Sequence, residues 1–262
     1  MAARKFNAAH HGSDAAALLR AIGAEPDEDT PRLAYADLIE EHGDAARAEL
    51  IRGQCEMERL DWRDPREREL SARVDALLKK YGARWRAKLP RVSGIEWARV
   101  PTRGFFEEVT VTDASALRDS GDIIRAAAPV SRLLIESPAT LTEVVGLPFM
   151  AGITHLIARF GAGSRGGAVA LASSAHATRL RYLNLGFCGV GGSGLVSLLT
   201  SPGLPALRDL MLRCACVGDD ALRGLTHVRL ELRYIDLAGN PIGDVGLEAI
   251  LRHPEMKRAQ PV

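Results

Sequence analysis

Apolar and polar residues follow different patterns in the two halves of the chain. From about residue 104 onward, segments of the form L-x-x-[LI]-x-L recur, each followed by a glycine-rich turn and an apolar run with helical spacing. The alternation predicts a strand whose leucines share one face, and the apolar run predicts a helix. Successive copies start 24, 23, 27, 27 and 25 residues apart. They begin at Phe106, Val130, Ile153, Leu180, Leu207 and Leu232.

One strand and one helix cannot bury an apolar face alone, so neighbouring copies are expected to stack and share a continuous core. A period near 25 residues with this leucine spacing is typical of leucine-rich repeats. The fold predicted for the chain is therefore an α/β leucine-rich-repeat solenoid. Its parallel sheet is expected to form the concave face, and an N-terminal α-helical unit is expected to cap it.

The first hundred residues are more highly charged and predict helices. Ser13 is expected to cap a short helix from Asp14 to Ile22, and Thr30 followed by Pro31 marks the start of another that ends before Gly43. A third helix is expected over 45–60, and Asp64 followed by Pro65 opens a fourth. The alternating stretch 95–112 is expected to start the sheet. The predicted organisation is a disordered N-terminus (1–12), a helical domain (13–103) and a repeat domain (104–262).

The helical part resembles the repeat-companion N-terminal domain of bacterial leucine-rich-repeat proteins with ribonuclease-inhibitor-like repeats. The resemblance rests on Pro26 with the acidic 27–29, Arg32-Leu33, Tyr35-Ala36-Asp37, Glu40-Glu41, Gly43-Asp44, Arg47-Ala48-Glu49 and Ile51-Arg52. Arg103-Gly104-Phe105 resembles the turn that joins that domain to its repeats. Leu38 departs from the pattern, because the family commonly has tryptophan there. The resemblance implies a fold and no catalytic chemistry.

The period of two along each strand also predicts which side chains point away from the core. Three rows are expected across the sheet, of which the first two start at Glu108 and Thr110 and the third at Thr112. Aromatic residues, methionine and arginine, which are enriched in protein interfaces, recur in these rows. The predicted partner-binding residues are Arg132, Leu134, His155, Ile157, Arg159, Tyr182, Asn184, Asp209, Met211, Arg213, Tyr234 and Asp236.

Two interpretations of this face stay open. The outward apolar side chains either bind a partner or form an intramolecular core under the N-terminal helices. In the first case the chain is a non-catalytic protein-interaction module, used as an adaptor, inhibitor or sensor. It contains no P-loop, H-E-x-x-H or G-x-S-x-G motif, so no enzyme activity and no cofactor are predicted.

Composition narrows the class of protein and the location that we expect. The 262 residues carry a formal net charge of +1, with 47% hydrophobic and 26% charged residues, which is ordinary globular material. No secretory signal and no apolar run of membrane-spanning length are evident, so we expect a cytoplasmic protein with no membrane partner, as a monomer or homodimer. Four cysteines are too few for a disulfide framework and are expected to be reduced.

Two motifs suggest chemistry but have structural explanations. Gly161, Gly163 and Gly166 match the G-x-G-x-x-G fingerprint, yet the spacing recurs at 189, 191 and 194, so we interpret it as a repeat turn. Cys188, Cys214 and Cys216 follow consecutive strands and raise the question of zinc. No fourth ligand is evident, and the sequence favours small buried cysteines.

The charged segments of the N-terminal half have two interpretations as well. Carboxylates between 27 and 49 and cations between 84 and 103 are expected to form charge-paired helix surfaces. The alternative function is a nucleic-acid-binding regulator, in which the basic stretch from Arg84 to Arg103 contacts phosphates while Trp85 and Trp97 stack on bases.

Overall fold

The computed structural model describes residues 8–61, 63–159, 165–225 and 231–253, and it divides into two compact units. The helical unit comprises the chain up to residue 91 together with 97–107 and 122–130. The sheet unit comprises 92–96, 108–121 and the chain from 131 onward. Each unit is described by itself below.

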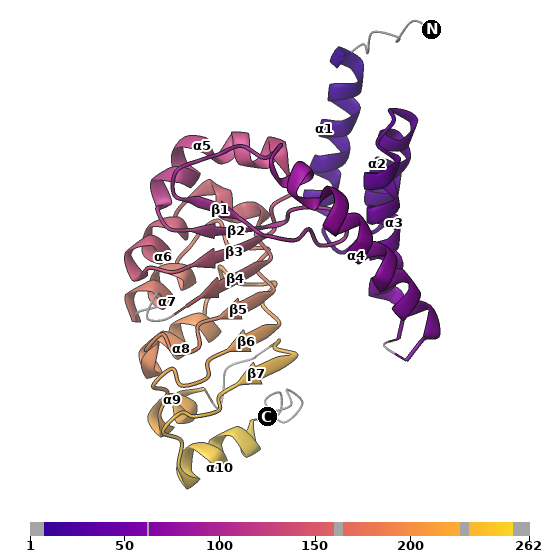
Figure 1. The fold of residues 1–262 in the computed structure, drawn as a ribbon. Coiled ribbons are helices and arrows are strands. Elements are labelled where there is room, and N and C mark those ends of the chain that lie inside the picture. The colour runs from indigo at the N-terminus through magenta and orange to yellow at the C-terminus, as the bar shows by residue number, and fades with distance from the viewer. Residues whose placement is uncertain (1–7, 62, 160–164, 226–230, 254–262) are drawn as a thin grey trace, which may run out of the picture. The chain divides into compact units, whose positions relative to one another are not determined.

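Four helices precede the sheet: α1 (Ala8–Ala24), α2 (Thr30–Glu41), α3 (Ala45–Arg59) and α4 (Pro65–Arg86) (Figure 1). The Asp64 carboxylate accepts the Arg66 backbone N–H, as expected of a cap before Pro65. The cap of α2 lies at Asp29, one residue before the predicted Thr30. The structure begins α1 at Ala8, within the segment 1–12 for which disorder was predicted and six residues before the predicted helix start at Asp14. Residues 1–7 lie outside the described part.

The core of the helical unit joins three helices to a segment far along the chain. Ile22, Ala36, Ala48, Ile51 and Cys55 pack with Phe105, which forms an isolated antiparallel bridge with Thr102. Gly104 has φ +84° beside α3, and a Cβ there would lie 2.9 Å from Ile51 Cβ and 3.0 Å from Ile51 Cα. Only glycine fits this close approach without displacing the backbone of α3.

A seven-stranded sheet runs in chain order from β1 to β7 (Figure 1). The five neighbouring pairs from β2 to β7 are parallel. The strands are β1 (Ile95–Trp97), β2 (Glu108–Val111), β3 (Arg132–Ile135), β4 (His155–Ala158), β5 (Tyr182–Asn184), β6 (Asp209–Met211) and β7 (Tyr234–Asp236). The predicted α/β class and the predicted strand in each repeat copy are confirmed.

Helices fill the connections between the strands. They are α5 (Ala114–Ala127), α6 (Pro138–Val144), α7 (Arg165–Ala172), α8 (Gly191–Leu199), α9 (Asp219–Gly224) and α10 (Asp244–Arg252), with a 3-10 helix, η1, at Pro148–Gly152. From α6 to α10, each helix contacts the next along one face of the sheet (Figure 1). Leu133, Leu156, Leu183 and Leu210 of the strands are fully buried, as the alternation predicted.

The turns after the strands explain the repeated glycines. Gly189 and Gly191 have φ values of +62° and +68°, a conformation that favours glycine. The repeat-turn interpretation is therefore confirmed in this copy. Gly161 and Gly163 of the other copy lie outside the described residues. Among the residues that the structure describes, no helix combines the length and apolarity needed to cross a membrane.

Candidate functional site

The outward side chains form two rows that run across six strands. Glu108, Arg132, His155, Tyr182, Asp209 and Tyr234 are register partners from β2 to β7, and so are Thr110, Leu134, Ile157, Asn184, Met211 and Asp236. The strand residues between them point into the core. The rows therefore have the membership that the sequence predicted, and residues about 25 positions apart in the chain become neighbours.

Exposure along the rows is uneven. Arg159 and Arg213 are exposed, most other predicted partner-binding residues are half-buried, and Leu134 is only 5% exposed. The prediction that Leu134 presents its side chain to a partner was wrong in this respect. An outward position guarantees no exposure, because neighbours across the sheet and two residues along the strand pack around a short apolar side chain.

A hollow of about 530 Å³ lies on this face, over β4 to β7. Its lining includes seven of the predicted partner-binding residues and adds three that the sequence analysis did not select. The lining residues are Ile157, Ala158, Arg159, Tyr182, Asn184, Gly186, Phe187, Met211, Arg213 and Asp236. The other predicted partner-binding residues are not among its lining: Arg132 and Leu134 lie on β3, and His155, Asp209 and Tyr234 lie on β4, β6 and β7.

Two polar residues of the hollow hold the chain just past its strands. Asn184 Oδ1 accepts the Gly186 N–H at 3.0 Å, and Asp236 Oδ1 accepts the Ala238 N–H at 2.9 Å. The other Asp236 oxygen lies 3.3 Å from Arg213 Nε. These contacts fix the lining and occupy most of the Asp236 carboxylate, which is 12% exposed.

Phe187 is the main feature that the sequence analysis missed. It is 59% exposed, lines the hollow and has φ +60°. A bulky residue in the left-handed region is uncommon and costs conformational energy. Its backbone is held there by a hydrogen bond from its N–H to Arg213 O, at 2.8 Å. The signal in the sequence was the aromatic residue inside a glycine-rich turn.

His155 lies in the first row, beside the hollow. Its ring stacks on Tyr182 with 5.4 Å between centroids, and Nδ1 lies 2.9 Å from Thr154 Oγ1. The pKa of His155 is lowered from 6.5 to about 4, first by burial and then by the positive charge of Arg132, while Asp209 acts in the opposite direction. The ring is therefore neutral at pH 7 and contributes a flat polar surface.

Cys188, Cys214 and Cys216 occupy turn positions after the strands. Asn240 bridges its turn with four hydrogen bonds, donating to Leu212 O and Leu237 O and accepting from Ala215 N and Val217 N. Cys188 takes the corresponding place in its repeat, where its thiol donates to Gly186 O at 3.2 Å and lies 3.7 Å from Ala158 O.

The prediction of small buried cysteines is confirmed for Cys188. It is wrong for Cys216, which is exposed, and Cys214 is half-buried. Cys214 and Cys216 both lie in the left-handed region, with φ values of 52° and 61° respectively. Over the described residues, no group of three or more histidine, cysteine or acidic side chains has the arrangement of a metal site.

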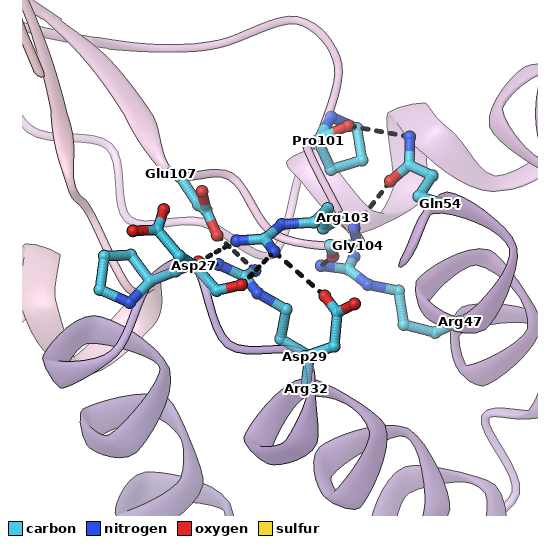
Figure 2. Close-up of polar contacts among 10 residues, drawn as sticks. Asp27, Asp29, Arg32, Arg47, Gln54, Pro101, Arg103, Gly104 and Glu107 are labelled. Atoms are coloured by element: carbon cyan, nitrogen blue, oxygen red, sulfur yellow. Dashed lines mark hydrogen bonds and ion pairs between the residues drawn. The ribbon is translucent and has the colours of Figure 1, made fainter. Parts of the chain in front are cut away.

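The helical unit contains a buried cluster of arginines and carboxylates (Figure 2). Arg103 Nη1 donates to Asp27 O at 2.9 Å and to Asp29 Oδ1 at 3.0 Å, while Arg32 Nη2 donates to Pro26 O at 2.7 Å. Arg32 also pairs with Glu107, and both side chains are buried. Desolvation lowers the pKa of Arg32, and Glu107 opposes that effect.

Arg47 is a further arginine of the helical unit that contacts the segment 101–107. Arg47 donates to Gly104 O, while Gln54 accepts from Gly104 N at 2.7 Å and donates to Pro101 O at 3.1 Å (Figure 2). The Arg47 guanidinium also lies over the Trp85 and Phe106 rings. These charged and amide side chains hold residues 101–107 against the helices. The predicted turn at 103–105 is therefore an anchoring segment of the helical unit.

The basic stretch of the nucleic-acid hypothesis is differently arranged from the prediction. Trp85 and Trp97 are only 4% and 8% exposed, so neither ring is available to stack on a base. Trp97 Nε1 donates to Pro90 O at 2.9 Å, and Arg103 is committed to the buried cluster. That part of the hypothesis was wrong because aromatic rings and arginine stems supply the local core.

Elsewhere on the helical unit, opposite charges are paired on the helix surfaces. Arg52 lies 2.6 Å from Asp37 and 2.7 Å from Glu40, and Arg73 lies 2.5 Å from Glu49. These three carboxylates are paired on helix surfaces as predicted, but their partners Arg52 and Arg73 lie outside the predicted basic stretch.

Strand, turn and helix thus recur as a unit, which places the sheet unit in a repeated α/β class. A family model described as Leucine Rich repeat matches residues 176–199 and 232–251. The first match contains β5 and α8, and the second contains β7 and most of α10. The matches support a leucine-rich-repeat protein. The comparison with curated proteins gives no match.

Proposed function

We propose that the sheet unit is a leucine-rich-repeat solenoid that binds a protein partner through its outward, concave sheet face. In this proposal the protein has no catalytic role and acts as an adaptor, inhibitor or sensor. The repeat matches favour it, because leucine-rich repeats generally mediate protein–protein interaction. The observation that carries it is the hollow over β4 to β7, with an exposed Phe187 and half-buried Tyr182 and Met211 in its lining.

Those residue types favour a protein partner over a small ligand. An exposed aromatic ring with half-buried tyrosine and methionine beside arginine has the composition of interface centres. The rows are continuous with the hollow and extend the available surface across six strands. The helical unit is proposed to be the companion domain that its sequence resembles. Its capping role and the cytoplasmic location stay predictions.

The test is a capture experiment with two matched variants of the full chain. The face variant carries Tyr182→Ala, Phe187→Ala and Met211→Ala. The control variant carries three apolar truncations at exposed helix positions of the same unit, Val169→Ala, Leu247→Ala and Leu251→Ala. Circular dichroism and thermal unfolding first establish that both variants fold.

Proteins captured by the wild type and the control variant, and lost from the face variant, are the expected result. Capture that survives in the face variant contradicts binding at this face. Loss from both variants points instead to nonspecific adhesion of apolar surface and contradicts the proposal equally.

A further inference from the structure

The charged groups of the hollow differ in how exposed they are and in how far neighbouring groups already bind them. Arg159, Arg213 and Asp236 are the charged residues of its lining. The Asp236 carboxylate is already engaged by the Ala238 N–H and by Arg213 Nε. Both arginines keep exposed side chains, and that of Arg213 is 52% exposed. The open charge of the hollow is therefore positive.

A glycine separates the two arginines. Continuing the register of β4, β5 and β6 by two residues places Gly186 between Arg159 and Arg213. Two strand steps put the backbones of the two arginines about 9.6 Å apart. No side chain rises from Gly186, where a Cβ would stand 3.4 Å from Arg213 O and 3.2 Å from Asn184 Oδ1. The lining is thus open between two guanidinium groups.

Apolar surface lies immediately beside this gap. Phe187 follows Gly186 in the chain and is exposed, and Ile157 and Met211 flank Asn184 in the second row. An exposed phenylalanine held at positive φ carries both a conformational cost and an unburied ring. A bulky apolar group placed on it removes that ring from water.

We propose that the hollow binds an internal peptide segment of the partner in which an aspartate or glutamate stands next to a bulky apolar side chain. The carboxylate lies between Arg159 and Arg213 above Gly186, and the apolar side chain packs on Phe187 and Met211. This inference rests on the proposed function and specifies the chemistry of its ligand. Arginine suits the role because its fork of donors matches a carboxylate.

The probes are four sets of N-acetylated, C-amidated decapeptides, which carry no terminal charge. Each peptide is labelled, and its anisotropy is measured against the full-length protein. The sets combine acidic with apolar residues, acidic with polar residues, basic with apolar residues, and neutral with apolar residues. We expect the acidic–apolar set to bind most tightly, and its affinity to fall as salt rises.

Four variants test the assignment. Arg159→Gln is expected to weaken the acidic–apolar peptides about ten-fold, since one charge-assisted contact is lost. Phe187→Ala is expected to weaken all apolar sets. Arg252→Gln removes an exposed arginine from α10, outside the hollow, and is expected to leave binding unchanged. Arg159→Glu is expected to shift the preference toward the basic–apolar set.

Equal binding of the neutral–apolar set, or insensitivity to Arg159→Gln, overturns the acidic assignment. If another set binds and is lost in Phe187→Ala, the ligand class is wrong while binding at this face stands. If no set binds, the peptide class is overturned, and the capture experiment decides the proposed function separately. A single-stranded oligonucleotide that binds in place of peptides and is lost in Arg159→Gln also overturns the proposal.

Discussion

Replacing Asn240 by alanine is the sharpest test of how the turns of the sheet unit are held. The side chain makes four hydrogen bonds, at 2.9 Å and 3.0 Å from Ala215 N and Val217 N, and at 2.7 Å and 2.8 Å to Leu212 O and Leu237 O. Three of these bonds join Asn240 to the preceding repeat, and the bond to Leu237 O lies within the repeat of Asn240 itself. Asn240→Ala removes all of them and leaves no group in their place.

The magnitude follows from the two amides. Ala215 and Val217 are fully buried, so their N–H groups lose their acceptor in a place that water does not reach. Leaving a buried donor unsatisfied costs about 1–3 kcal/mol. Two such donors predict a loss of about 2–6 kcal/mol in the free energy of unfolding of the sheet unit. Asn240→Asp keeps the acceptor but loses both donors, and we expect a smaller loss.

The assay must separate the two units. Trp85 and Trp97 both belong to the helical unit, so tryptophan fluorescence during urea unfolding reports mainly on that unit. Hydrogen exchange over β5 to β7 reports on the sheet unit. We expect faster exchange there in Asn240→Ala, with little change in the fluorescence midpoint.

The matched control is Asn184→Ala, which removes an asparagine from the same sheet. It loses one hydrogen bond of ordinary length, the 3.0 Å bond from Gly186 N, and one 3.5 Å contact with Tyr182. A cost of about 1 kcal/mol is expected. If Asn240→Ala costs no more than this control, the reasoning about the bridged turn is refuted.

Three further predictions concern pH, thiols and glycines. With its pKa held near 4 in the folded chain, His155 takes up its proton more readily when unfolded, so stability is full above pH 6.5 and falls toward pH 4. Urea midpoints at pH 7 and pH 5 should therefore differ less in His155→Gln, and an unchanged difference contradicts the prediction. Maleimide should label exposed Cys216 in the native protein but spare Cys55, since burial raises the pKa of Cys55 to about 12; mass spectrometry that finds Cys55 labelled first refutes this. Gly43→Ala and Gly104→Ala both add a Cβ at positive φ, but only the second meets another helix, so its loss of thermal stability should be clearly larger; equal losses contradict the packing of α3.

The sheet was largely predictable from the sequence because two regularities fix it. The period of two selects the buried leucines, and the 25-residue period sets the register, so row partners such as His155 and Tyr182 followed from counting. Burial was less predictable, because the exposure of Leu134 depends on its neighbours and not on its own strand.

The hollow and the buried cluster were beyond such rules. Phe187, Cys214 and Cys216 adopt left-handed conformations that turn rules assign to glycine or asparagine, so their place on the surface had no local signal. Arg32 and Glu107 pair across 75 positions of the chain, and no spacing along a helix or strand relates them. Sequence patterns describe short-range geometry, whereas these features arise from long-range packing.

An extended ligand that crosses the parallel strands β2 to β7 has a residue spacing that differs from the spacing of the strands. Rows repeat about every 4.8 Å across the sheet, while same-side residues of an extended peptide repeat about every 6.8 Å. The two spacings coincide only at intervals. The length of two strand steps, about 9.6 Å, comes close to the length of three residues of an extended peptide. Residues three apart in an extended peptide point to opposite sides, so a partner segment laid across the strands cannot present same-side residues to both Arg159 and Arg213, and one acidic side chain above Gly186 has to serve both. Selectivity in such a protein is set by spacing as much as by chemistry.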